Sequence, residues 1–319
     1  MPVPKLLIIH QGALGDFILT FPAIARLQAH TDCIDVLCQG RLGRLAQSLG
    51  LANNAHPLEA ARFASLFSHQ TDARTDDLLA TYGDIVLFSL SGALEQSVNR
   101  LCVQPVCRIP PRPPADIRIH LAQFVLEKLV CCGRIDKVDA DPTNTWAPKP
   151  KAAPEIPAKI LLHPGAGSMR KRWPVSHFLD VATRLAADGL TPEFILGPAE
   201  TDLVPALQHV NRPVHTLEDL QDLVVLLQSA GGYIGNDSGA SHLAAFLGLP
   251  SVVIFGPTDP VRWAPVGRRV KIVRPALQCR PCFETETTNC DTPECLEQTI
   301  PRQVIEAFYT LYREKNRGT

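Results

Sequence analysis

The chain alternates short apolar segments with amphipathic ones, and this alternation limits the fold more than any other feature of the sequence. The apolar segments lack a polar–apolar alternation, as in KLLIIH at residues 5–10. Strands of this kind are buried on both faces, which is typical of parallel sheets covered by helices. The segments between them carry apolar residues at helical spacing, as in FILTFPAIARLQA at residues 17–29. The sequence therefore predicts an α/β fold with doubly wound parallel sheets.

The same pattern predicts where the individual elements lie. Strands are expected at residues 5–10, 34–38, 85–90, 107–109, 159–163, 193–196, 232–235, 251–255 and 271–273. Helices are expected at residues 17–29, 41–49, 76–82, 92–101, 117–131, 175–187, 199–210, 217–230, 238–247 and 301–315.

Two proline-rich segments, residues 104–114 and 142–157, interrupt the pattern, because proline lacks a backbone donor and restricts the preceding residue. We interpret the first segment as a loop within the N-terminal half and the second as an interdomain linker. With 319 residues, and roughly 150 per domain, we expect two domains, at 1–150 and 151–319. The C-terminal helix at 301–315 is expected to be able to pack back on the first domain. Ligands of such folds bind at the carboxyl ends of the strands, so we expect them in a cleft between the domains.

Charge and hydropathy exclude several classes of protein. The 31 Lys and Arg residues balance 32 Asp and Glu residues, which argues against a generally basic nucleic-acid-binding protein. No run approaches the roughly 18 to 20 apolar residues that cross a bilayer. The short apolar N-terminus ends in a glycine loop, unlike a signal peptide. We therefore expect a soluble, cytoplasmic protein.

The first strand runs into GALGD at residues 12–16. Glycines allow a tight turn and close approach of a ligand, although GxGxxG, the dinucleotide-binding pattern, is absent. Asp16 has two interpretations. It is either the N-cap of the following helix, a position that favours Asp, or a general base at the ligand site.

The second half opens with HPGAGSMRKRWP at residues 163–174, in which glycines and a serine precede three cations. This combination suits a diphosphate, since backbone donors and cationic side chains can both contact its oxygens. The alternative is a solvated basic loop. The Walker pattern GxxxxGK[ST] is absent.

A third loop, NDSGASH at residues 236–242, leads directly into an apolar helix. Ser238 can cap that helix, and the backbone N–H groups that follow would face the ligand site. His242 is expected to be a structural residue, and a hydrolase triad is disfavoured because GxSxG is absent. Glu200 follows a strand and could accept hydrogen bonds from ribose hydroxyls, or be an ordinary acid of a first helical turn.

Two further groups could bind metals. The DAD sequence at residues 139–141 is interpreted as solvated loop carboxylates, because it abuts the proline-rich linker rather than ending a strand. Four cysteines lie close enough in sequence to enclose a structural zinc ion: Cys279, Cys282, Cys290 and Cys295. Reduced thiols and disulfides are the alternatives for them, and none of the three gives these cysteines a catalytic role.

Together, these loops resemble the heptosyltransferases of the lipopolysaccharide core, glycosyltransferase family 9. The resemblance spans residues 6–304 and rests on four segments in the same order: GALGDFILTFPAIARL, HPGAGSMRKRWP, ILGPAETD and IGNDSGASHLAAFLGLPSVVIFGPTDP. It implies the GT-B fold, in which two doubly wound, Rossmann-like domains face each other across a cleft. The N-terminal domain would bind the acceptor and the C-terminal domain the nucleotide sugar.

The resemblance also implies roles for single residues. Asp16 matches an acid taken to deprotonate the acceptor hydroxyl, and Lys171 a lysine that balances the charge of the donor diphosphate. The implied donor-binding residues are Ser168, Lys171, Glu200, Asp237, Ser238, Gly239 and His242. The acceptor-binding residues expected are Gly12, Gly15, Arg41 and Arg112.

The activity that follows is inverting transfer of heptose from ADP-L-glycero-D-manno-heptose to the inner core of lipopolysaccharide, with no metal required and no cofactor. The partners expected are the ADP-sugar, a lipid A-core glycolipid and the cytosolic face of the inner membrane, without nucleic acid. Two alternatives stay open. One is a family member with another nucleotide sugar or acceptor, and the other is a catalytically silent nucleotide-sugar-binding protein.

Overall fold

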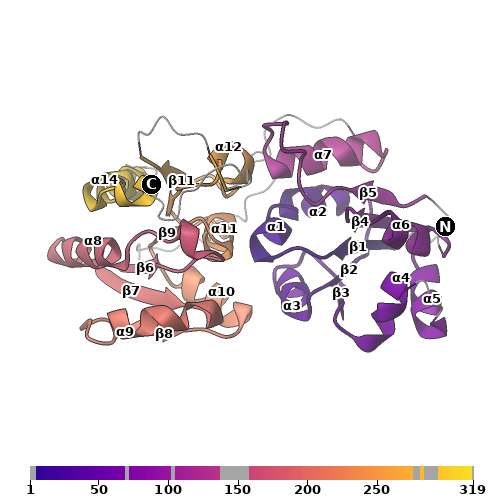
Figure 1. Cartoon of the computed structure of the whole chain (residues 1–319), viewed down its shortest axis with the longest axis horizontal. Coiled ribbons are helices and arrows are strands. Elements are labelled where there is room, and N and C mark those ends of the chain that lie inside the picture. Colours follow the sequence, from indigo (N-terminus) through magenta and orange to yellow (C-terminus); the bar gives the residue numbers. More distant parts are fainter. Residues whose placement is uncertain are drawn as a thin grey trace. The chain divides into compact units, whose positions relative to one another are not determined.

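The computed structural model describes residues 5–68, 72–101, 105–136, 158–275, 281–283 and 294–317. The chain divides into two compact units, Met1–Thr145 and Trp146–Thr319, each of which is described by itself (Figure 1). The domain boundary that the sequence predicts, between residues 150 and 151, lies outside the described residues.

The N-terminal unit contains a five-stranded parallel sheet in the order β3-β2-β1-β4-β5. Its strands are β1 (Leu6–His10), β2 (Ile34–Cys38), β3 (Asn54–Pro57), β4 (Asp84–Phe88) and β5 (Cys107–Ile109). The chain passes from β1 through β2 to β3 at one edge of the sheet, and then crosses to β4, which pairs with the other side of β1. The topological switch point, where ligands of such sheets bind, therefore lies between β1 and β4.

Helices cover this sheet. They are α1 (Leu14–Ile18), α2 (Phe21–Leu27), α3 (Gly40–Ser48), η1 (Ala61–Ala64), α4 (Ser65–Ser68), α5 (Ala73–Ala80), α6 (Gly92–Asn99) and α7 (Leu121–Cys131). On one face, Leu7, Leu37 and Leu87 of the strands form a core with apolar side chains of η1, α4, α5 and α6. On the other face, Phe17 of α1 contacts the ring of His10, and α2 packs on α7.

The C-terminal unit contains a six-stranded parallel sheet in the order β11-β10-β9-β6-β7-β8. Its strands are β6 (Lys159–His163), β7 (Thr191–Leu196), β8 (Val214–Thr216), β9 (Gly232–Asn236), β10 (Ser251–Ile254) and β11 (Val270–Val273). Here the chain builds from β6 to β8 and then crosses to β9, so the switch point lies between β6 and β9.

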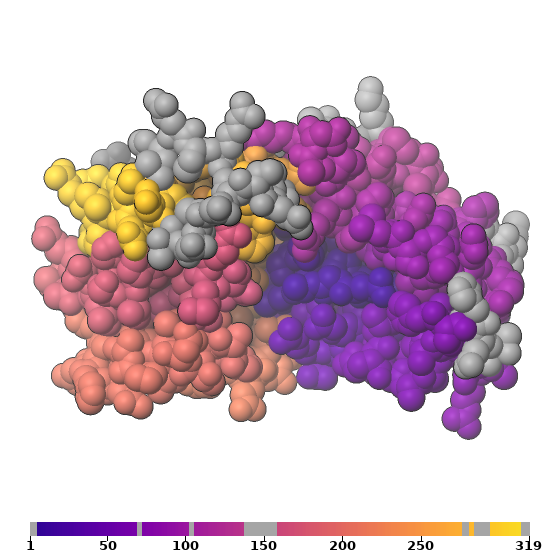
Figure 2. Space-filling view, viewed as in Figure 1, coloured from indigo at the N-terminus to yellow at the C-terminus, as the bar shows by residue number. Residues whose placement is uncertain are grey.

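The helices of this unit are η3 (Met169–Lys171), α8 (Val175–Ala187), η4 (Pro198–Leu203), α9 (Val204–Leu207), α10 (Leu220–Gln228), α11 (Gly239–Phe246), α12 (Pro260–Trp263), α13 (Glu294–Glu297) and α14 (Pro301–Arg317). A large apolar core joins α8 and α14 to one face of the sheet, around Phe178, Phe194 and Phe308. Helix α11 contacts β9 and β10. In the space-filling view the outer face of α14, in yellow, lies at the surface (Figure 2).

The sequence analysis allowed the C-terminal helix to pack back on the N-terminal domain. Among residues 301–313 of this helix, whose side chains the structure describes, the buried ones are Val304, Ala307, Phe308 and Leu311, which belong to the core of the C-terminal unit. Helix α14 is therefore part of the C-terminal fold.

The α/β class and the parallel sheets that the sequence predicts are confirmed. Residues 17–29, expected as one helix, instead contribute to α1 and α2. The break follows Ile18: the hydroxyl of Thr20 donates to the carbonyl of Phe17 at 2.6 Å, and Pro22 lies in the first turn of α2. Two strands were missed, β3 and β8. Both lie at sheet edges and contain a histidine, so they lack the apolar run of a central strand.

Among the described residues, no helix combines the length and the apolar character needed to cross a bilayer.

Candidate functional site

The loop after β1 in the N-terminal unit is built on a buried histidine. His10 lies beside the rings of Phe17 and Phe88, with centroid distances of 5.0 and 5.3 Å. Burial lowers the pKa of His10 to about 4, so its imidazole is neutral at pH 7. Nδ1 accepts a hydrogen bond from the N–H of Gly12 at 3.2 Å, which leaves the ring proton on Nε2. His10 thereby holds the glycine loop against the sheet.

Asp16 is the third residue of α1, whose N-cap is Ala13. The interpretation of Asp16 as the helix cap is therefore wrong, because the helix begins at Leu14, three residues earlier than the sequence suggested. One Asp16 oxygen lies 3.9 Å from a terminal nitrogen of Arg112, which brings two of the predicted residues together. The Asp16 side chain is 22% exposed and the Arg112 side chain 63%, so Asp16 keeps access to solvent.

Gly12 is required by this packing. A Cβ at Gly12 would lie 2.7 Å from Cε1 of His10 and 3.1 Å from Cβ of Asp16. Gln39, which the sequence analysis missed, connects the loop to α3: its amide donates to the Gly12 carbonyl at 3.4 Å and accepts from Nε of Arg41 at the same distance. Gly15 lies inside α1, where its carbonyl accepts from the N–H of Leu19.

The C-terminal unit gathers polar side chains at its own switch point. They follow four adjacent strands, β7, β6, β9 and β10. Parallel strands end at the same edge of a sheet, so loops far apart in sequence meet there.

A buried ion pair joins two of these loops. The ammonium of Lys171, after β6, lies 2.9 Å from Oδ2 of Asp237, after β9. The same oxygen accepts a hydrogen bond of 2.8 Å from the hydroxyl of Thr258, after β10. Nε2 of His242 is 3.9 Å from the other oxygen of Asp237. Lys171 also lies 4.8 Å from the centre of the Phe283 ring. The Asp237 side chain is 5% exposed and that of Lys171 20%, so a buried carboxylate is paired with a lysine that keeps some access to solvent.

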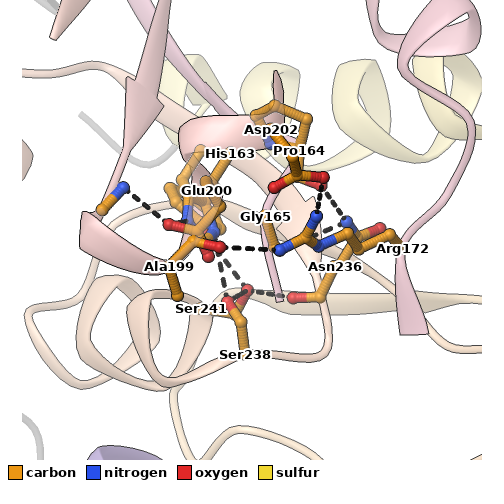
Figure 3. A network of polar contacts seen from close by, with 12 residues as sticks. His163, Pro164, Gly165, Arg172, Ala199, Glu200, Asp202, Asn236, Ser238 and Ser241 are labelled. Atoms are coloured by element: carbon orange, nitrogen blue, oxygen red, sulfur yellow. Dashed lines mark hydrogen bonds and ion pairs between the residues drawn. The ribbon is translucent and has the colours of Figure 1, made fainter. Parts of the chain in front are cut away.

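A second polar network joins β6, β7 and β9 (Figure 3). Nδ1 of His163 lies 3.2 Å from the hydroxyl of Ser238, and Nε2 lies 3.9 Å from Oε2 of Glu200. Burial raises the pKa of Glu200, but His163, the Gly197 N–H and Arg172 together hold it below its usual value. Glu200 is therefore a carboxylate at neutral pH, although it is only 6% exposed.

The turn that carries Glu200 is fixed from two sides. Oε2 of Glu200 accepts from the N–H of Gly197 at 2.6 Å. Arg172 donates to the carboxylate of Asp202 at 2.6 Å and to the carbonyl of Ala199 at 3.0 Å (Figure 3). A Cβ at Gly165 would lie 2.4 Å from the carboxyl carbon of Glu200, so only glycine fits there without a shift.

Asn236, at the end of β9, is fully buried and ties the β6 loop to β9. Its amide nitrogen donates to the carbonyls of Pro164 and Gly165 at 2.8 and 3.2 Å. Its amide oxygen accepts from the N–H of Trp173 at 3.0 Å. One side chain thus satisfies three backbone groups and fixes the loop that carries Lys171.

The structure therefore brings together Lys171, Asp237 and His242 in one cluster, and Glu200 with Ser238 in another. Ser238 occupies the N-cap position of α11, but its hydroxyl contacts His163 and Ser241 and does not cap the helix. Gly239 is the first residue of α11. Ser168 precedes η3, where its carbonyl accepts from the N–H of Lys171.

Sequence reasoning missed His163, Asn236 and Thr258. Each stands at or after the carboxyl end of a buried strand, and that position was the available signal.

The cysteine cluster is only partly described. The sulfur of Cys282 lies 3.8 Å from a terminal nitrogen of Arg170, and Cys295 packs beside the apolar core. Cys279, Cys290 and the DAD sequence at residues 139–141 lie outside the described residues. Within the described part of the chain, no three metal-ligand side chains come together.

Comparison with known proteins shows which family part of the chain resembles. The model for glycosyltransferase family 9 (heptosyltransferase) matches residues 139–291. Lipooligosaccharide heptosyltransferase 2 of Campylobacter jejuni is 31% identical over 168 residues, which are 50% of this chain and 52% of that protein. The match thus spans about half the length of this curated relative.

Two solved structures resemble the whole chain. A family 9 glycosyltransferase of Veillonella parvula has a TM-score of 0.80 at 17% identity and covers 98% of both chains. The ADP-heptose lipopolysaccharide heptosyltransferase II of Escherichia coli has a TM-score of 0.72 at 18% identity and covers 98% of this chain and 99% of its own. This likeness shows the fold, which is GT-B.

Proposed function

Because the model for glycosyltransferase family 9 (heptosyltransferase) matches residues 139–291, we propose that this chain is an inverting heptosyltransferase of lipopolysaccharide biosynthesis. Its donor would be ADP-L-glycero-D-manno-heptose and its acceptor the inner core of lipopolysaccharide. The E. coli structure of the same fold is described as an ADP-heptose lipopolysaccharide heptosyltransferase, which supports this choice of donor.

The observation that carries the proposal is the buried pair of Lys171 and Asp237 at the switch point of the C-terminal sheet. An ammonium held in place beside the start of α11 can stabilise the negative charge that develops on a departing diphosphate. Ser238, Gly239 and His242 would line the phosphates and the sugar, with Ser168 at the start of η3. Glu200 would accept hydrogen bonds from the ribose hydroxyls.

The N-terminal unit would supply the base. In inverting transfer an acceptor oxygen attacks the anomeric carbon while the bond from that carbon to the ADP oxygen breaks on the opposite side. The acceptor hydroxyl must lose its proton, and the partly exposed carboxylate of Asp16 would take it. Gly12 and Gly15 would let the acceptor approach α1, and Arg41 and Arg112 would contact its anionic groups.

Several further features belong to the proposal. The reaction would proceed without a divalent cation, because Lys171 and the backbone N–H groups of α11 supply positive charge to the leaving group. The glycolipid acceptor would bring the protein to the cytosolic face of the inner membrane. The cysteine cluster stays a candidate structural zinc site without a role in transfer.

The proposal is tested by incubating the protein with ADP-heptose and lipopolysaccharide that lacks heptose. We expect release of ADP that depends on the acceptor, and an acceptor that is heavier by one heptose in mass spectrometry. Binding of ADP-heptose without transfer would favour the catalytically silent alternative. Transfer from another nucleotide sugar would favour a different donor within the family.

A further inference from the structure

His163 is the last residue of β6, and the proposed function gives its side chain no role. It is buried between two residues that the proposed function places at different parts of the donor. One ring nitrogen is 3.2 Å from the hydroxyl of Ser238, at the diphosphate, and the other is 3.9 Å from the carboxylate of Glu200, at the ribose (Figure 3). A single rigid ring therefore lies within hydrogen-bond distance of Ser238 and, on its other side, faces the carboxylate of Glu200 at ion-pair distance.

A neutral His163 ring carries a proton on one nitrogen only, so its interaction with Glu200 and its interaction with Ser238 depend on each other. A carboxylate only accepts, so the ring nitrogen that faces Glu200 is best used as a donor. In a neutral imidazole the other nitrogen, Nδ1, then has only a lone pair and accepts the proton of the Ser238 hydroxyl.

The surroundings of Ser238 limit the alternatives. The Ser238 hydroxyl also lies 3.3 Å from the Ser241 hydroxyl. The Ser241 hydroxyl donates to the carbonyl of Asn236 and lies 3.1 Å from the hydroxyl of Tyr233. Because Ser241 uses its own proton at Asn236, it can only accept from Ser238. The Ser238 proton thus has two internal acceptors, and a phosphate oxygen would compete with both.

We infer that His163 is a positioning residue that couples Glu200 to Ser238, so that the ribose part and the diphosphate part of the donor site do not act independently. The inference rests on the proposed function. Ser238 is 9% exposed and Glu200 6%, so bulk water does not screen or replace the contacts that the ring makes.

The test is a double-mutant cycle on ADP affinity, measured by titration calorimetry. The proteins are the wild type, Glu200→Gln, Ser238→Ala and the double variant. In the wild-type background we expect the loss of affinity in the double variant to differ from the product of the two single losses by about threefold or more, as for residues within one polar network.

The same cycle is then measured in two histidine backgrounds. His163→Asn keeps a polar atom near the position of Nδ1, beside Ser238, and His163→Gln keeps one near the position of Nε2, facing Glu200. Each variant keeps one contact and loses the other, so in both backgrounds we expect the two effects to multiply within about twofold. A merely structural role of His163 would weaken binding without changing this ratio.

A matched control is available in the same unit. His215 and Glu193 form another histidine–glutamate pair, in which Nε2 of His215 lies 2.8 Å from the carboxylate of Glu193. The same carboxylate lies 3.6 Å from the ammonium of Lys159, at the start of β6. His215→Gln should leave the ADP affinity and the coupling unchanged.

The outcomes separate the two proposals. If the wild type binds no ADP, the proposed function fails and this inference fails with it. If ADP binds but the two substitutions act independently in the wild type, or if their coupling survives in both histidine variants, only the role of His163 is refuted.

Discussion

The ammonium of Lys171 lies 2.9 Å from the carboxylate of Asp237, although the two residues follow different strands of the sheet. The pair is held in place by the hydroxyl of Thr258, which donates to the same carboxylate oxygen. Removing one partner of such a buried pair leaves the other without compensation. The pair therefore links the stability of the C-terminal unit to the charge of its proposed diphosphate site.

Lys171→Ala should weaken ADP binding and transfer together, each by about tenfold or more, because a charge-assisted contact to the diphosphate is lost. It should also lower the melting temperature, since Asp237 keeps its charge without the cation. Adding Asp237→Asn to Lys171→Ala should recover much of the melting temperature and none of the ADP affinity. Calorimetric titration and thermal unfolding measure the two effects separately. Full ADP affinity in Lys171→Ala would exclude Lys171 from the donor site.

Two glycines of one loop give a matched pair of substitutions. Gly165→Ala would place a methyl group 2.4 Å from the carboxyl carbon of Glu200, whereas the space around Gly167 is open within 4 Å. We expect Gly165→Ala to lower the free energy of unfolding by about 1 to 3 kcal/mol, as overpacking does, and to weaken ADP binding by displacing Glu200. Gly167→Ala should change neither quantity. Equal effects of the two substitutions in urea unfolding would contradict this packing.

The buried imidazole of His10 predicts a pH dependence of stability. Burial lowers its pKa from 6.5 to about 4, so between these values the unfolded chain binds a proton that the folded chain does not. Stability is therefore lost as the pH falls from 6.5 to 4, by up to about 3 kcal/mol from this group. His10→Asn keeps an acceptor for the Gly12 N–H but cannot titrate.

The measurement compares unfolding free energies of the wild type and His10→Asn from pH 7 to pH 4. The difference between the two proteins should shift in favour of the variant as the pH falls. A difference that stays constant with pH would mean that His10 takes up its proton equally in both states.

Much of the fold follows from local pattern. Strands such as Ile34–Cys38 and Lys159–His163 lie where their apolar runs predict, because central strands of a parallel sheet are buried on both faces. The edge strands β3 and β8 do not follow from pattern, since an edge strand needs no apolar run and is defined by its neighbour.

The candidate site, like the fold, could be predicted from the sequence only in part. Asp16, Lys171, Glu200 and Asp237 could be named because each follows a predicted strand by a few residues, within segments whose order resembles that of a family. The pairing of Lys171 with Asp237 could not be predicted, since it depends on β6 and β9 being neighbours across the switch point. Nor could the role of Asn236, whose three hydrogen bonds go to backbone groups of a distant loop.

The central claim is that the carboxylate of Asp16 removes the proton of the acceptor hydroxyl while the C-terminal unit holds the ADP-sugar. Asp16→Asn keeps the size of the side chain and removes the base. Its effect should therefore fall on the chemical step and spare the donor site, which belongs to the other unit.

The most direct measurement is acceptor-dependent ADP release by Asp16→Asn and by the wild type, at saturating ADP-heptose, together with the ADP affinity of both proteins. We expect turnover to fall by about 10² to 10⁴-fold, the usual contribution of a general base, while the ADP affinity changes by less than about twofold. Turnover within threefold of the wild type would contradict the assignment of the base and, with it, the proposed mechanism.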